Sequence, residues 1–308
     1  MSATYENVIV FGPTGDVGGH VAREASKRGA KVWLAMRDPT KHIDGISDEQ
    51  EQQGPYSRLQ ADLSDVASVE EAIRKSGAKA AFLYLAHTKD GPKDAIAALK
   101  KSGVEYVVFL SSFSLQPFDD IRKIPQSEII PFGHAQGEIA LEEIGLAFTA
   151  LRPAYFASNP YKMNLDQSKT PYTATVSAKT DEFDYITPTD IGRVGGAVLV
   201  NRPSTNAKEV IYLCGPRLLA QSEAWNIISN ASRQEIKVEH VSAEQFEQSL
   251  IAKQMPPPIA KYLTDSFYKQ SAQDLYPEPW YSSTLANIKK YSGYEPISFE
   301  EYAKSQKI

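Results

Sequence analysis

A glycine-rich turn near the N-terminus is the feature of this sequence that most restricts its fold. The apolar run Val8-Ile9-Val10-Phe11 leads directly into Gly12-Pro13-Thr14-Gly15-Asp16-Val17-Gly18. Three glycines at this spacing, between an apolar strand and an amphipathic helix, are typical of turns that bind dinucleotides. The first permits the tight turn, the second lets the backbone approach a pyrophosphate, and the third lets helix and strand pack closely. The alternative is a turn whose glycines serve packing only.

The start of the following helix is the expected site of the pyrophosphate, because its free N–H groups and its dipole attract anions. The residues of this turn that we predict to contact the cofactor are Gly12, Thr14, Gly15, Asp16, Val17 and Gly18.

A repeated pattern in the N-terminal half predicts helices that alternate with buried strands. Helix-like stretches end at Gly29, Gly77, Gly103 and Gly145, and a short continuous apolar run follows each of them. Glycine tolerates the left-handed conformation that ends a helix, and continuous apolar runs are typical of strands buried on both faces. From Val8 to Leu151 we therefore predict an α/β fold with a doubly wound parallel sheet, the Rossmann fold. This pattern alone would also fit an α/β domain without a cofactor.

Two local predictions accompany this pattern. Ser68 with Glu71 has the spacing of a capping box at a helix start, and the polar run 48–53 is expected to be an exposed loop.

After Pro153 the alternation breaks, and we predict a division into two lobes. Residues 1–159 plus 186–215 are expected to form the NAD(P)-binding Rossmann domain, with a helix that begins near Thr187 and a strand over 209–214. Residues 160–185 plus 216–308 are expected to form a smaller C-terminal α/β lobe that binds substrate over the mouth of the sheet.

The end of the second strand bears on the choice between NADP(H) and NAD(H). NAD-preferring sites usually offer a carboxylate to the ribose there, whereas this chain has Met36-Arg37-Asp38-Pro39-Thr40-Lys41. A guanidinium can hold a 2′-phosphate through paired hydrogen bonds, and Lys41 would add a second charge. We expect NADP(H) in preference to NAD(H), although Asp38 leaves NAD(H) open. The alternative is that Arg37 and Lys41 are both solvated surface residues.

Asp62 ends the third strand, where its carboxylate can accept a hydrogen bond from the adenine amino group and can also cap the next helix, two roles that are compatible. The predicted cofactor contacts continue along the carboxyl edge of the sheet through Leu63, Leu85, Ser111, His134 and Asn159.

These motifs together resemble the NmrA-like branch of the atypical short-chain dehydrogenases/reductases. The resemblance covers roughly residues 5–216 and includes 109–112, 148–153, Tyr155-Phe156 with Asn159, and Asp190-Ile191-Gly192. It implies a Rossmann fold with a bound dinucleotide. The family includes NADP-dependent reductases of secondary metabolism, epimerase-like enzymes, and redox-sensing regulators that bind a dinucleotide without turnover.

The chain departs from the patterns of its relatives at two places. Ordinary short-chain dehydrogenases pair a catalytic tyrosine with a lysine four residues later, and no tyrosine here has lysine at that spacing. In many NmrA-like reductases a lysine precedes the glutamate that corresponds to Glu138 by four residues, and here that position is His134. An imidazole can bind a ribose hydroxyl or act as a general acid, but it lacks the permanent charge of lysine. The alternative is a histidine at a helix start with no chemical role.

Ser112 and Tyr155 complete the predicted catalytic set with His134. Ser112 ends the fourth long apolar run, where its hydroxyl either binds a substrate carbonyl or caps the loop. Tyr155 follows the last strand of the series and is a proton donor, a stacking wall or part of the core.

Composition excludes several other classes of site. The net charge of −5 argues against a nucleic-acid-binding surface. Cys214 is the single cysteine and the five histidines are scattered, so we expect no disulfide and no metal site. The absence of a signal-peptide pattern and of a long apolar segment predicts no membrane contact and a cytoplasmic location.

The expected activity is that of an NADP(H)-dependent oxidoreductase. The many tyrosines and prolines of the C-terminal lobe favour a small apolar or aromatic substrate with a carbonyl, imine or enone group. Two alternatives remain open: a non-catalytic dinucleotide sensor that binds a protein partner, and an isomerase or epimerase.

Overall fold

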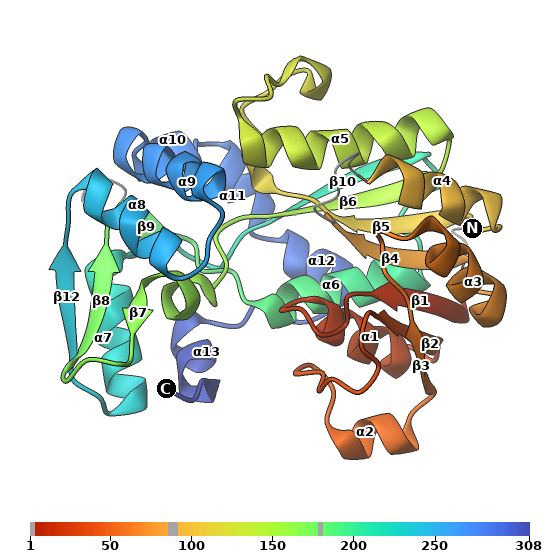
Figure 1. Ribbon diagram of the computed structural model, residues 1–308, viewed down its shortest axis with the longest axis horizontal. Helices are drawn as coiled ribbons and strands as arrows, with labels where there is room; N and C mark the ends of the chain where they lie inside the picture. Colours follow the sequence, from red (N-terminus) through yellow and green to blue (C-terminus); the bar gives the residue numbers. More distant parts are fainter. Residues whose placement is uncertain (1–3, 86–91, 178–180) are drawn as a thin grey trace.

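A seven-stranded parallel sheet forms the centre of the larger lobe of the computed structural model, which describes residues 4–85, 92–177 and 181–308 (Figure 1). The strand order is β10-β6-β5-β4-β1-β2-β3. The strands are β1 (Asn7–Phe11), β2 (Lys31–Met36), β3 (Tyr56–Gln60), β4 (Ala80–Tyr84), β5 (Tyr106–Leu110), β6 (Ala147–Pro153) and β10 (Lys208–Leu213). The doubly wound parallel sheet predicted from the sequence is confirmed.

The order of the strands places the ligand-binding edge. From β1 the chain runs outward through β2 to β3, and it then returns to β4 on the other side of β1, where Val8 lies beside Ala80. In open α/β sheets, ligands bind outside the carboxyl ends of the strands at such a reversal of strand order. Gly12 follows β1, and Tyr84 ends β4.

Helices cover both faces of this sheet because the side chains of each strand alternate between two apolar clusters. In β1, Val8 and Val10 join one cluster while Ile9 and Phe11 join the other. The first face is covered by α1 (Gly18–Lys27), α6 (Pro188–Val200) and α12 (Asn287–Ser292). The second face is covered by α3 (Val66–Ser76), α4 (Lys93–Lys101) and α5 (Ile129–Ile144).

Helices end at the glycines where the sequence predicts it. Two other local predictions, the capping box at Ser68 and the loop over 48–53, are wrong. The glycines after α3 and α5, Gly77 and Gly145, have φ of 61° and 72°. The N-cap of α3 is Asp65 rather than Ser68, because the Asp65 carboxylate accepts from the backbone of the first helical turn. Glu71 pairs with Arg74 instead.

Residues 48–53 form a helix, α2 (Asp48–Gln53), rather than the expected loop. Ser47 and Gln50 make a reciprocal capping box at its start, which satisfies N–H groups that would otherwise lack partners.

The smaller lobe contains two further sheets and most of the C-terminal helices (Figure 1). In one sheet β8 (Tyr172–Val176) lies between β7 (Leu165–Asp166) and β12 (Ile236–His240); in the other, β9 (Glu182–Phe183) pairs with β11 (Leu219–Ala220). The remaining helices are α7 (Gln221–Ser232), α8 (Ala243–Ala252), α9 (Pro257–Lys269), α10 (Ala272–Leu275), α11 (Trp280–Thr284) and α13 (Phe299–Ser305), with the short helices η1 (Phe113–Leu115), η2 (Ile121–Lys123) and η3 (Pro160–Asn164).

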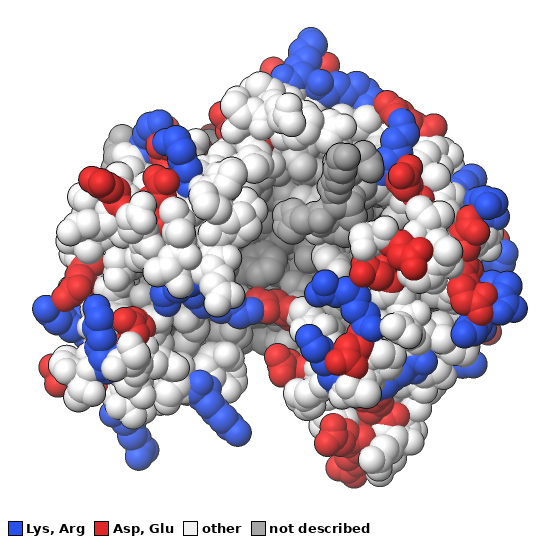
Figure 2. Space-filling view, in the orientation of Figure 1, with Lys and Arg blue, Asp and Glu red and all other residues white. Residues whose placement is uncertain are grey.

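The predicted residue ranges of the two lobes, and their roles in binding cofactor and substrate, stay predictions. The C-terminal third contributes to both parts, since α12 packs against α6 and Arg28 of the larger lobe donates to the Ser292 carbonyl at 2.5 Å. Figure 2 shows the surface hollowed between the two lobes. Among the residues described, no helix has the length and apolar character needed to cross a bilayer.

Candidate cofactor and substrate site

The glycine turn after β1 has the geometry of a dinucleotide cradle. Gly12 has φ of +68°, a conformation that glycine adopts without strain. A Cβ on Gly18 would lie 2.3 Å from the Gly12 carbonyl oxygen, so this glycine is required for α1 to begin against the turn.

Gly15 differs from the other two glycines of the turn because, among the residues that the structure describes, none requires glycine there. A Cβ on Gly15 would meet no atom closer than the Gly12 carbonyl oxygen at 3.4 Å, and Thr14 and Gly15 are both exposed. The open side of Gly15 is therefore a place where a ligand can approach the backbone, as a pyrophosphate would. Val17, by contrast, is buried in the core.

At the adenosine end of the predicted site, the structure brings Arg37 and Asp62 together but leaves Lys41 apart. Arg37 and Asp62 line a polar cavity of about 530 Å³ beyond the ends of β2 and β3. Lys41 does not line this cavity, and its carbonyl accepts from Arg58 at 2.8 Å. Asp38 accepts from the Thr40 backbone and hydroxyl, so its carboxylate already has local partners.

Asp62 is held in place by its own loop. Its carboxylate accepts from the backbone and hydroxyl of Ser64, at 2.9 and 2.8 Å, and these bonds lower its pKa. The helix cap that was the second predicted role for Asp62 belongs to Asp65. Leu63 is buried in the core beneath this loop.

Tyr84 is a residue of the cofactor edge that sequence reasoning missed. Its ring lies against Gly12, where a Cβ would come within 2.5 Å of the tyrosine Cε1. Its position at the end of β4, beside the glycine turn, was the signal that could have identified it. Tyr84 also lines the large cavity described next.

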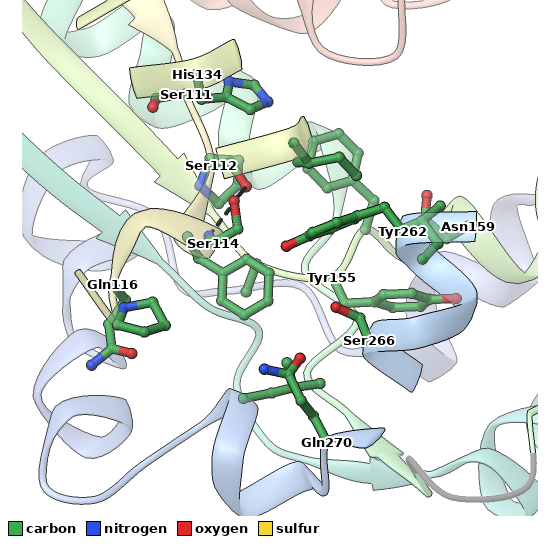
Figure 3. Close-up of a pocket in the computed structure, with 18 of the residues that line it drawn as sticks. Ser111, Ser112, Ser114, Gln116, His134, Tyr155, Asn159, Tyr262, Ser266 and Gln270 are labelled. Atoms are coloured by element: carbon green, nitrogen blue, oxygen red, sulfur yellow. Dashed lines mark hydrogen bonds between the residues drawn. The ribbon is translucent and has the colours of Figure 1, made fainter. Parts of the chain in front are cut away.

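A cavity of about 640 Å³ lies beyond the carboxyl ends of β4, β5 and β6 and extends to α9. Six residues that were predicted from separate parts of the sequence line it: Leu85, Ser111, Ser112, His134, Tyr155 and Asn159. Figure 3 labels all of these except Leu85. The other walls of the cavity are largely apolar: Leu110, Phe113, Phe118, Ile130, Phe156, Met163, Phe183, Leu263, Phe267 and Leu275.

The two adjacent serines after β5 have different surroundings. Ser111 is buried, and its hydroxyl donates to the Glu138 carboxylate at 2.7 Å. Glu138 is fully buried and also binds Arg152 through two hydrogen bonds, at 2.8 and 2.7 Å. Ser111 therefore belongs to a buried polar network that joins α5 to β6.

Ser112 lines the cavity and also caps η1, so the capping role is present and the binding of a substrate carbonyl stays a prediction. The backbone N–H and hydroxyl of Ser114 both donate to the Ser112 oxygen, at 3.2 and 2.9 Å. Figure 3 shows these two hydroxyls beside each other at the cavity wall.

His134 reaches the same cavity from α5. Its ring lies beside that of Phe109, with 6.4 Å between the ring centroids. The helix can approach β5 this closely because a Cβ on Gly137 would lie only 2.4 Å from the Phe109 ring. A glycine one turn along the helix thus helps to set the position of the histidine.

The surroundings of Tyr155 favour a role as an aromatic wall of the cavity over a role as a proton donor. Its ring stacks on Phe183 at 4.0 Å and meets Tyr185 and Phe267 edge-on. Burial, with the nearby Asp184 carboxylate, raises the pKa of the Tyr155 phenol well above its usual value.

Asp184 is a buried carboxylate that no pattern in the sequence indicated. It accepts from the backbone N–H groups of Tyr155 and Gly215, at 2.8 and 2.7 Å, and from the Tyr276 hydroxyl at 2.8 Å. Burial raises its pKa to about 6, although these hydrogen bonds oppose the increase. Asp184 therefore links the ends of β6 and β10 to the smaller lobe.

Tyr262, from α9 of the smaller lobe, is a further polar group of the cavity that sequence reasoning missed. Figure 3 shows its ring extending into the cavity toward Ser112 and Ser114. Burial, with the charge of Glu128, raises the pKa of Tyr262 to about 12, so its hydroxyl stays protonated near neutral pH.

The chain is similar to known proteins over nearly its whole length. The model of the NmrA-like family matches residues 4–303. The nitrogen metabolite regulation-like protein bik4 of Gibberella fujikuroi is 40% identical over 321 residues, which cover 99% of this chain and 98% of that protein.

Solved structures with a similar fold include two proteins crystallised with a cofactor. The NADPH-dependent quinone oxidoreductase of Escherichia coli, complexed with NADPH, has a TM-score of 0.70 and 18% identity, and the match covers 96% of this chain and 98% of that one. The triphenylmethane reductase of Citrobacter sp., complexed with NADP(H), has a TM-score of 0.67 and 15% identity, with 96% and 99% covered. At these identities the likeness shows a shared fold.

Proposed function

The chain belongs to the NmrA-like family, and we propose that it is an NADP(H)-dependent oxidoreductase acting on a small apolar or aromatic carbonyl, imine or enone. The observation that carries this proposal is the position of the 640 Å³ cavity. It lies at the carboxyl ends of β4, β5 and β6, next to the glycine turn, and Tyr84 contacts both. A cofactor bound along this edge would have its nicotinamide at the cavity.

The preference for NADP(H) rests on Arg37. Its guanidinium lines the polar cavity beyond β2 and can hold a 2′-phosphate, whereas the nearest acidic side chain along the chain, Asp38, is bonded to Thr40. The quinone oxidoreductase and the triphenylmethane reductase that share the fold were crystallised with NADPH and NADP(H).

The bound cofactor would supply the hydride, and the residues of the chain would bind and orient the acceptor. The aromatic walls exclude water and suit a planar, apolar substrate. The hydroxyls of Ser112 and Tyr262 can donate to an oxygen or nitrogen on which negative charge develops. Ser114 supports this arrangement because its own hydroxyl donates to Ser112. His134 borders the same space and is our candidate for the group that provides the proton.

The test is oxidation of NADPH in the presence of a panel of aromatic ketones, imines, quinones and cyclic enones, followed by nicotinamide absorbance. We expect turnover with part of the panel and slower turnover with NADH at the same concentration. A Gly15→Ala variant should turn over more slowly at low NADPH concentration because it binds the cofactor more weakly. Tight binding of NADPH without turnover of any compound would contradict the enzymatic proposal.

A non-catalytic dinucleotide sensor is the second candidate, and two observations favour it. His134 takes the place of a lysine found in many NmrA-like reductases, and the relative that is 40% identical is named as a regulation-like protein. A sensor must distinguish the oxidised from the reduced cofactor. Calorimetry with NADP⁺ and NADPH would therefore support this candidate if the affinities differ strongly while the panel gives no turnover.

A further inference from the structure

One ion pair joins the glycine turn to the smaller lobe. The Asp16 carboxylate accepts from the Ser158 hydroxyl at 2.8 Å, and its other oxygen is paired with the Lys162 ammonium. Asp16 directly follows Gly15, whereas Ser158 and Lys162 lie beyond β6 in the segment that leads into the smaller lobe.

The segment that carries Lys162 is a single turn whose two sides contact different parts of the site. Ser158 and Lys162, four residues apart and joined by a backbone hydrogen bond of 3.2 Å, face Asp16. Asn159 and Met163, also four residues apart, line the large cavity. The turn continues as the π-helix η3, a conformation that occurs often at functional sites. It therefore lies between the glycine turn and the cavity.

The position of Asp16 creates an electrostatic conflict for the proposed cofactor. A dinucleotide carries a negatively charged diphosphate, and the site proposed for it is the open side of Gly15, next to the Asp16 carboxylate. Two negative charges that lie close together repel each other unless a cation lies between them. Lys162 provides that cation, and 58% of its side chain remains exposed. Its flexible stem and three N–H donors allow it to bind two anions at once.

We propose that Lys162 is a cofactor-binding residue whose ammonium group is shared between Asp16 and the diphosphate when the dinucleotide binds. The smaller lobe then supplies a positive charge to a cofactor whose other contacts come from the larger lobe. This inference rests on the part of the proposed function that concerns dinucleotide binding and does not depend on turnover.

The experiment is calorimetry of Lys162→Ala with NADPH, NADH and 2′-AMP. Both dinucleotides should bind about 10- to 150-fold more weakly, as expected for the loss of one charge-assisted hydrogen bond. The affinity for 2′-AMP should not change, because this ligand has the adenosine and the 2′-phosphate but no diphosphate. The melting temperature should also stay close to that of the wild type, because an exposed ion pair contributes little stability.

Three further variants sharpen the test. Lys169→Ala is the matched control: Lys169 is also exposed and paired with an aspartate, Asp166, but it lies away from the glycine turn, so its removal should have no effect. Lys162→Arg should keep most of the affinity because it keeps the charge. Asp16→Asn should bind NADPH at least as tightly as the wild type, because it removes the repulsion and releases the ammonium from its partner.

The possible results distinguish a failure of the Lys162 inference from a failure of the proposed function on which it rests. A wild-type protein that binds none of the three ligands overturns the proposed function, and this inference with it. A wild-type protein that binds NADPH, with unchanged affinity in folded Lys162→Ala, overturns the inference alone. Equal losses for NADPH and 2′-AMP in that variant also overturn it, because they indicate a general disturbance of the site.

Discussion

Gly15 and Gly18 belong to the same turn, yet the structure predicts opposite effects when each receives a methyl group. At Gly15 the new Cβ would be 3.4 Å from its nearest neighbour, an ordinary contact, and the backbone is not left-handed. Gly15→Ala should therefore change the free energy of unfolding by no more than about 1 kcal/mol. At Gly18 the Cβ would lie 2.3 Å from the carbonyl oxygen of Gly12 and 2.9 Å from its carbon. Overpacking against backbone should destabilise Gly18→Ala by about 1–3 kcal/mol.

Although Gly15→Ala should change the stability little, it should weaken the binding of the cofactor. The methyl group would occupy the open side of the turn, where a diphosphate would approach the backbone N–H groups. Displacing the diphosphate from one charge-assisted hydrogen bond costs about 1.5–3 kcal/mol, which corresponds to a loss of about 10- to 150-fold in affinity.

Two measurements check this prediction. Thermal unfolding without ligand should leave Gly15→Ala within a few degrees of the wild type and lower the melting temperature of Gly18→Ala by roughly 2–4 °C for each kcal/mol lost. Calorimetry with NADPH should then show weak binding by the stable Gly15→Ala protein. If that variant is folded and binds NADPH as the wild type does, the diphosphate does not lie at this turn. If Gly18→Ala is as stable as the wild type, the packing argument is wrong.

Three other variants test the remaining parts of the site. Arg37→Ala should lower the affinity for NADPH by about 10- to 150-fold and that for NADH much less, whereas Lys41→Ala should change neither; calorimetry showing equal losses for both cofactors in Arg37→Ala would refute the 2′-phosphate role. Burial raises the pKa of Asp184 from 3.8 to about 6, so its contribution to stability is greatest at low pH and is lost as the pH rises through 6. The stability of the wild type relative to Asp184→Asn should therefore fall by up to about 3 kcal/mol between about pH 3 and pH 7, and a difference independent of pH in denaturant titrations would contradict this. His134→Ala should reduce kcat about 100- to 10,000-fold if the imidazole donates the proton. If His134 only orients the cofactor, the affinity for NADPH should fall while kcat survives, and a variant unchanged in both would exclude either role.

The sequence predicted the central sheet and the turn because their determinants are local. Continuous apolar runs and helix-ending glycines follow from burial and backbone conformation within a few residues of each strand. The roles of Gly12 and Gly18 likewise follow from a left-handed φ and a close backbone contact inside one turn. The same local reasoning was wrong at Ser68. Asp65 caps α3 three residues earlier by accepting from the N–H groups of Ala67 and Ser68, so Ser68 lies inside the helix.

The missed residues have partners that are distant in the sequence. Tyr262 lies on an amphipathic helix of the smaller lobe, and the packing of α9 over the cavity decides that its hydroxyl faces Ser112. Asp184 precedes an apolar stretch and has no motif of its own. It is buried because backbone groups of Tyr155 and Gly215, from two different strand ends, donate to it. No local pattern contains such information.

The two serines after β5 show how tertiary contacts assign roles that the sequence leaves equal. Successive side chains of a strand point to opposite faces, and Phe109 faces the helix layer that contains α5. Ser111 continues on that side and is held by Glu138 of α5. A hydroxyl that donates to a buried carboxylate cannot also donate to a substrate. Ser112 points the other way, into the cavity. A substrate oxygen that enters the cavity would therefore be bound by Ser112 or by Tyr262. Ser114, whose hydroxyl donates to Ser112, and Ser111, whose hydroxyl donates to Glu138, would hold the wall of the cavity in place.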